Sequence, residues 1–122
     1  MKIEIKGKKL KEGVRYHGVI SDYKQIESRL IISVRFNTDP ETIYIKSIQI
    51  NESVNSSFAR FAEDLDIIDE EGNADTDYLD GMHIIANLQR GYDGCLYIDR
   101  MIIDDKYYDT LVDDKKKETE KG

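Results

Sequence analysis

Three segments near the start of the chain alternate apolar and polar residues, which is the pattern of strands with one buried face. They cover residues 13–20, 29–37 and 42–50. The first continues toward Tyr23, and the second is the most regular of the three. The third is rich in β-branched and aromatic side chains, which favour strands. The pattern predicts three consecutive strands.

Three positions interrupt this regular pattern. Gly18 lies inside the first segment, where glycine weakens a strand and indicates a bend or bulge. The apolar phase of the third segment shifts halfway along, which predicts a bulge near Lys46 or Ser47. Pro40 belongs to the sequence TDPE, which we expect to form a turn outside both flanking strands. A long first strand that bends between two sheet faces is typical of a barrel.

The period changes after the third segment. One apolar stripe with helical spacing consists of Phe58, Phe61, Ala62, Leu65 and Ile68. A serine at position 56 or 57 is available as N-cap, and a glycine follows the stripe. The spacing predicts one amphipathic helix from about Ser57 to Asp69.

Two more alternating segments, residues 81–88 and 95–103, are joined by the glycine-rich sequence QRGYDG and predict a hairpin. The order is therefore three strands, one helix and two strands. This order matches the OB-fold, a partly open five-stranded barrel that binds ligands on strands two and three and on two loops. We expect a mainly β, five-stranded OB-fold-like barrel with one helix between strands three and four. Another small barrel or sandwich carrying a helix is the competing interpretation.

The composition is that of one soluble globular domain: 122 residues, 39% hydrophobic and 35% charged, with a net charge of −7. Residues 1–11 carry five Lys and one Glu (+4), residues 12–103 eight Lys or Arg and seventeen Asp or Glu (−9), and residues 104–122 five and seven (−2). We expect a basic N-terminal segment, the folded domain and a partly disordered charged tail over these three ranges. No signal peptide or membrane span is evident, so we expect a cytoplasmic protein.

Candidate catalytic and metal-binding residues are few. The only histidines, His17 and His83, and the only cysteine, Cys95, lack the spacing of a zinc site, and we expect structural roles for them, with Cys95 a small buried side chain. No phosphate-binding glycine loop or nucleophile elbow occurs. We therefore expect no enzyme activity, cofactor or metal.

Aromatic and cationic residues alternate on the predicted ligand face of the barrel. Bases stack on aromatic rings while Lys and Arg neutralise phosphates, so this mixture suits single-stranded nucleic acid. The same residue types are also common on solvent faces of strands, and both interpretations stay open. The candidate nucleic-acid-binding residues are Tyr23, Lys24, Arg35, Tyr44, Lys46, Arg90 and Tyr92.

The segment EDLDIIDEEGNADTDYLD, residues 63–80, holds nine Asp or Glu and no cation. It does not fit an EF-hand, because a glycine at the sixth position would put Ile67 or Thr76 first. Glu70 and Glu71 follow the predicted helix, where the dipole disfavours anions. The alternative interpretation is that the segment is a negative surface that binds a basic protein. The candidate residues for this surface are Asp66, Asp69, Glu70, Glu71, Asp75 and Asp77.

The segments LKEGVRYHGVISDYKQIESRLIISVRF and LDGMHIIANLQRGYDGCLYIDRMII, within residues 10–103, carry a resemblance to a known family. With the aromatic helix between them, they resemble small phage-encoded OB-fold proteins regarded as binders of single-stranded DNA. Leu10, Gly13, Tyr16, Leu79 and Gly81 carry the likeness. It implies a phage or mobile-element protein that acts near replication or recombination. The acidic body supports the alternative, an anti-CRISPR or DNA-mimic inhibitor that blocks a basic host protein.

Overall fold

The computed structural model describes residues 1–3 and 9–110, which form a mainly β domain. Its strands are β1 (Arg15–Ile26), β2 (Arg29–Phe36), β3 (Asp39–Gln49), β4 (His83–Arg90) and β5 (Leu96–Ile103). They pair antiparallel in one five-stranded sheet of order β3-β2-β1-β4-β5. Helix α1 (Ser57–Asp64) and the short 3₁₀ helix η1 (Thr76–Leu79) lie between β3 and β4. The predicted five strands and intervening helix are confirmed.

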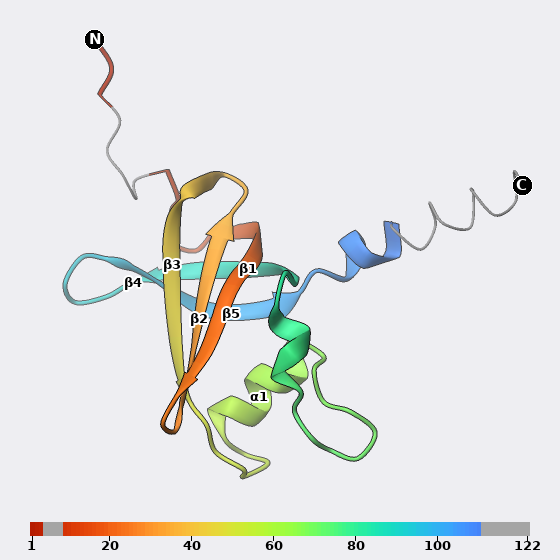
Figure 1. The fold of residues 1–122 in the computed structure, drawn as a ribbon. Helices are drawn as coiled ribbons and strands as arrows, with labels where there is room; N and C mark the ends of the chain where they lie inside the picture. Colours follow the sequence, from red (N-terminus) through yellow and green to blue (C-terminus); the bar gives the residue numbers. More distant parts are fainter. Residues whose placement is uncertain (4–8, 111–122) are drawn as a thin grey trace, which may run out of the picture.

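The sheet folds over on itself because β1 belongs to both halves. The first part of β1, Arg15 to Val19, pairs with β4, and the part from Gly18 to Ile26 pairs with β2. In Figure 1, β1, β2 and β3 run side by side while β4 and β5 cross behind them, with α1 beneath. The two edge strands, β3 and β5, form no ladder with each other, so the sheet is not closed into the expected barrel.

The core fills the space enclosed by the bent sheet and α1. In β2 every second residue is buried, as predicted. The helix adds Phe61 and Ala62, the loop after it adds Ile67, and η1 adds Leu79. The largest fully buried side chains are Phe36, Ile20, Leu30, Ile32, Leu65, Ile67, Leu79, Ile84, Leu88, Met101 and Val34.

The irregular positions differ from those predicted. The bulge in β1 lies between Ile20 and Asp22, whereas Gly18 pairs regularly on both sides and permits close packing: a Cβ there would lie 2.8 Å from the carbonyl oxygen of Arg35. The predicted bulge at Lys46 or Ser47 is wrong, since the register of β3 shifts near its start instead. The expectation that Pro40 lies in a turn outside both strands is also wrong. Pro40 lies inside β3, and this edge strand tolerates a residue that has no backbone N–H donor.

Helix α1 ends five residues earlier than the apolar spacing predicts. Ser56 caps its start by accepting a hydrogen bond from the Ala59 amide at 3.0 Å. Asp66 then adopts a left-handed backbone (φ 55°), which ends the helical turn. As a result Ile67 is buried and Ile68 is partly exposed, the reverse of the predicted phase.

Both histidines hold the segment that follows β5. The His17 Nδ1 atom lies 2.7 Å from Oδ2 of Asp104, which is buried. Residues 105–110 are helical, and the Tyr107 ring stacks on His83 at a centroid distance of 3.5 Å. The Tyr108 hydroxyl accepts a hydrogen bond from the His83 amide at 3.1 Å. Residues 104–110 are thus an ordered part of the domain, whereas the rest of the predicted tail, 111–122, and residues 4–8 of the basic segment lie outside the described residues.

Candidate nucleic-acid interface

The seven residues predicted to bind nucleic acid lie in five different places. Lys24 and Arg35 lie on the outer face of β1 and β2, the face away from the core. The Arg35 guanidinium donates a hydrogen bond to the Pro40 carbonyl at 2.8 Å. Beside them on β3, Ile43 and Ile45 are exposed, so this face is mixed rather than strongly basic.

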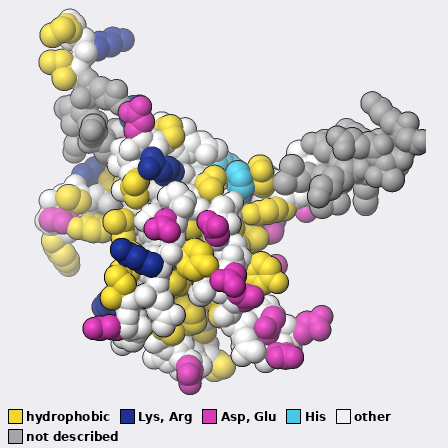
Figure 2. Space-filling view, viewed as in Figure 1, with side chains coloured by type: hydrophobic (Ala, Val, Ile, Leu, Met, Phe, Trp, Pro, Cys, Tyr) yellow, Lys and Arg dark blue, Asp and Glu magenta, His cyan; other side chains and the backbone are white. Residues whose placement is uncertain are grey.

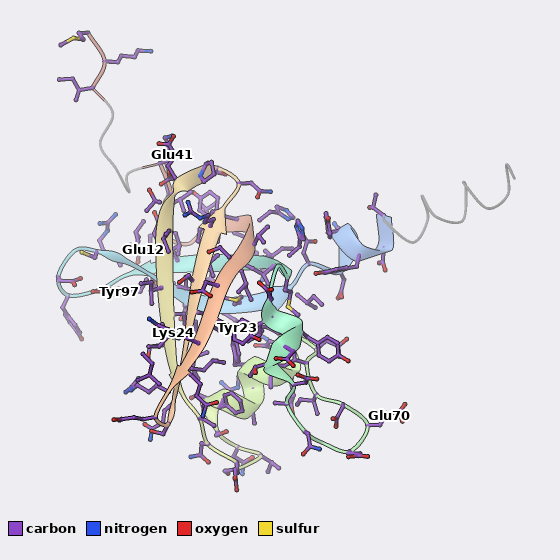
Figure 3. All side chains as sticks on the ribbon, viewed as in Figure 1. Glu12, Tyr23, Lys24, Glu41, Glu70 and Tyr97 are labelled. Atoms are coloured by element: carbon purple, nitrogen blue, oxygen red, sulfur yellow. The ribbon has the colours of Figure 1, made fainter. Side chains whose placement is uncertain are left out.

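Two of the three predicted aromatic residues, Tyr23 and Tyr44, point away from that outer face. The Tyr23 hydroxyl donates to Oδ1 of Asp77 at 3.0 Å, beside η1 (Figure 3), and this hydrogen bond raises the pKa of Tyr23. Tyr44 is 9% exposed and packs edge-on against Phe36, with ring centroids 5.4 Å apart. The expected place of Tyr44 on an open ligand face is therefore wrong, because its side chain belongs to the core phase of β3.

Arg90 is the last residue of β4, and Tyr92 lies in the turn between β4 and β5. The Arg90 side chain donates to the Gly94 carbonyl and lies 3.9 Å from the Glu12 carboxylate. Tyr92 is fully exposed. In the same turn Cys95 is exposed, not buried as predicted.

Lys46 lies between the two edge strands. Its ammonium donates to the carbonyl oxygens of Ile98 at 3.1 Å and Asp99 at 3.3 Å, both on β5. Burial lowers the pKa of Lys46, and the negative charge of Asp99 partly offsets this effect. Lys46 therefore bridges the gap that a closed barrel would fill with a strand ladder.

Next to this bridge is a groove of about 550 Å³ between β3, α1 and β5, which we call the β3–β5 groove. Its lining includes the four cations Arg29, Lys46, Arg60 and Arg100, and the two carboxylates Asp64 and Asp99. Four positive and two negative charges give a local formal charge of +2, in a chain whose net charge is −7. Only Lys46 was a predicted site residue. The other cations carry no local signal, since each lies on a different element.

Two of the groove arginines have fixed orientations. The Arg100 side chain donates from Nε and from one Nη to the Asp64 carboxylate, at 3.2 and 3.1 Å, and these hydrogen bonds raise the pKa of Arg100. The Arg29 side chain donates to the Ser47 hydroxyl at 3.0 Å. Arg60 is exposed on α1, and its side chain has no hydrogen bond or ion pair with the described residues. The groove therefore presents one free and several positioned cations.

The acidic segment forms a separate surface. Figure 2 shows Asp and Glu side chains gathered over the loop that follows α1, and Glu70 points away from the domain at the tip of this loop (Figure 3). Asp69 accepts hydrogen bonds from the amides of Glu71 and Asn73 at 3.0 and 2.9 Å. Asp75 accepts one from the Asp77 amide at 3.0 Å. Among the six predicted carboxylates, the side chains of Asp66, Glu70 and Glu71 have no hydrogen bond with another described residue.

Within residues 1–3 and 9–110, His, Cys, Asp and Glu side chains form no group of three or more that could hold a metal ion. The same part of the chain has no helix long and apolar enough to cross a membrane.

No protein-family model matches the chain, and no curated protein matches it either. The resemblance to phage OB-fold proteins therefore stays a prediction, and it rests only on the sequence of residues 10–103.

Proposed function

We propose that the chain is a non-enzymatic OB-fold protein of phage or mobile-element type that binds single-stranded nucleic acid in the β3–β5 groove. The strand order and the helix between β3 and β4 support the OB-fold assignment, since that fold is a five-stranded, partly open barrel. The groove differs from the ligand face expected from sequence, which was the surface of β2 and β3.

The observation that carries the proposal is the concentration of four cations around one groove of about 550 Å³ in a strongly acidic protein. Surface charges of one sign beside a concave, partly apolar wall attract and orient a polyanion. Phe61 and Met101 give the groove an apolar lining, and Arg29 and Arg60 line it beside them. Such a groove can follow a sugar–phosphate backbone while leaving the bases accessible.

Binding of this kind is sensitive to salt, because each neutralised phosphate releases counterions with a slope of about −0.7 for single strands. Two of the four cations are less available to phosphate, because the Arg100 guanidinium is paired with Asp64 and the Lys46 ammonium donates to a carbonyl oxygen of β5. Two to four phosphate contacts are then expected, which corresponds to a total slope of roughly −1.5 to −3.

The test is fluorescence polarisation with a labelled oligothymidylate of about fifteen nucleotides, at several salt concentrations. Arg60→Ala is the informative variant, because Arg60 has no partner among the described residues whose loss would disturb the fold. We expect weaker binding and a slope that is smaller in magnitude by about 0.7. Lys24→Ala is the comparison that separates the groove from the ligand face expected from sequence: the Lys24 side chain is also exposed and has no hydrogen bond or ion pair with a described residue, but it lies on the outer face of β1.

Two results would contradict the proposal. One is that the folded wild type binds no oligonucleotide at low salt; the other is that Lys24→Ala weakens binding as much as Arg60→Ala does. If the wild type fails to bind nucleic acid but captures a basic host protein, and Glu70→Lys with Glu71→Lys abolishes the capture, the acidic segment is the functional surface. That outcome would support the inhibitor of anti-CRISPR or DNA-mimic type.

A further inference from the structure

A second, smaller pocket lies on the outer face of β1, β4 and β5. It has a volume of about 240 Å³ and is lined by Arg15, Ile85, Ala86, Asn87, Arg100 and Ile102. The sheet register explains why the polar residues meet: Arg15 lies opposite Asn87 on β4, and Asn87 lies opposite Arg100 on β5. Side chains directly opposite each other share one face of a sheet. The three residues therefore form one row across three strands, which we call the Arg15 row.

The side chains of this row keep hydrogen-bond donors that no described residue uses. Asp64 holds Nε and one Nη of Arg100, which leaves its other Nη hydrogens unused. The Asn87 side-chain nitrogen donates to Oδ2 of Asp99 at 3.1 Å, so its carbonyl oxygen and second N–H remain available. The Arg15 guanidinium has no hydrogen bond or ion pair with any described residue. No carboxylate of the described residues lines the pocket itself, and the two nearby carboxylates, Asp64 and Asp99, are already bonded to Arg100 and Asn87.

The apolar part of the pocket indicates what accompanies the anion. Ile85 and Ile102 lie opposite each other in the register, directly beside the Arg15 row. Adjacent strands are about 4.8 Å apart, so the backbones at Arg15 and Arg100 are separated by about 10 Å. This distance suits two side chains that close from both sides on one phosphate, while the isoleucines contact a sugar or a base. Arginine is suited to this task because its planar fork binds phosphate in a bidentate manner.

We propose that the Arg15 row binds one phosphate of a nucleotide unit, with the sugar or base on Ile85 and Ile102. This inference rests on the proposed function: Arg100 lines both the β3–β5 groove and the pocket, so a strand leaving the groove reaches the row by passing over Arg100. The Arg15 row then extends the binding site by one or two nucleotides.

The experiment compares oligothymidylates of about six and about fifteen nucleotides, which span the usual site sizes of OB-folds. We expect Arg15→Ala to weaken binding of the long oligonucleotide about fivefold and to leave the short one unchanged. Arg15→Lys restores the charge without the fork and should recover only part of the loss. Thermal melts confirm that each variant is folded.

A second arm identifies the source of the phosphate. Amide chemical shifts of the wild type are recorded with thymidine 5′-monophosphate and with the long oligonucleotide. If the amide shifts of Arg15, Asn87 and Arg100 change with both ligands, the pocket binds the phosphate of a free nucleotide as well as that of a strand. If they change with the oligonucleotide alone, the pocket binds only a phosphate within a strand. The inference would be overturned if Arg15→Ala bound each oligonucleotide as tightly as the wild type does and if no amide chemical shift of the Arg15 row changed on binding. Failure of the wild type to bind any oligonucleotide would instead overturn the proposed function.

Discussion

Replacement of Tyr44 by phenylalanine should make the protein more stable, although the ring packs in the core. The Tyr44 hydroxyl is buried and has no hydrogen-bond partner within residues 1–3 and 9–110, and Oδ2 of the buried Asp39 has none there either. A buried polar group without a partner costs about 1–3 kcal/mol. Phenylalanine keeps the edge-on contact with Phe36 and removes that cost. We expect the free energy of unfolding to rise by about 1 kcal/mol, which corresponds to about 4 °C in melting temperature.

The pH dependence of the free energy of unfolding provides a second test of the same prediction. Burial raises the pKa of Tyr44 above its ordinary value of 10.0, and the negative charge of Asp39 acts in the same direction. As the pH rises past 10, the unfolded chain therefore loses this proton before the folded chain does, and the wild type loses stability. Phenylalanine carries no proton, so the advantage of Tyr44→Phe should grow between pH 7 and pH 11.

The assay is urea denaturation of wild type and Tyr44→Phe at both pH values. Tyr92→Phe is the control, because the fully exposed Tyr92 should change the free energy of unfolding by less than about 0.5 kcal/mol. A loss of 1 kcal/mol or more for Tyr44→Phe at pH 7 would refute the reasoning, since it would mean that the hydroxyl has a partner in solution. Oligonucleotide affinity of Tyr44→Phe should equal that of the wild type.

Two further substitutions test the packing. Gly18→Ala should destabilise the protein by about 1–3 kcal/mol, because the added Cβ meets the backbone carbonyl of Arg35 at 2.8 Å; a urea midpoint equal to that of the wild type would contradict this. Asp104→Ala removes the contact with His17 and the acceptor for the Tyr107 amide at 3.2 Å. It should cost about 1–2 kcal/mol and accelerate amide exchange in residues 105–110, and unchanged exchange there would show that the segment is held by other contacts.

The alternation of β2 was sufficient to predict its buried face, because each of Leu30, Ile32, Val34 and Phe36 is apolar and each is buried. The same logic failed in β3. Ile43 and Ile45 are apolar but face solvent, and the opposite phase of the strand supplies the buried Tyr44 and the half-buried Lys46. The sequence pattern records residue type, whereas burial depends on which face the neighbouring strand covers.

The candidate site was less predictable than the fold. Arg29, Lys46, Arg60 and Arg100 come from four elements and meet only because the sheet folds over on itself and α1 lies beneath it. No short-range spacing encodes that arrangement. The Arg15 row likewise depends on the registers of two strand pairs, β1 with β4 and β4 with β5. In contrast, the acidic segment is contiguous in the chain, and its exposed position was visible in the sequence.

The segment anchored by the two histidines changes where the domain ends. Asp104 and residues 105–110 cover part of the outer face of β1 and β4, so a chain cut after Ile103 would lose the ring stacked on His83 and leave His17 without its carboxylate. For a protein of this size, such a cut removes part of the folded unit rather than an appendage. A shortened chain used for binding measurements should therefore keep every residue through Thr110, and a fusion partner is better joined beyond that position.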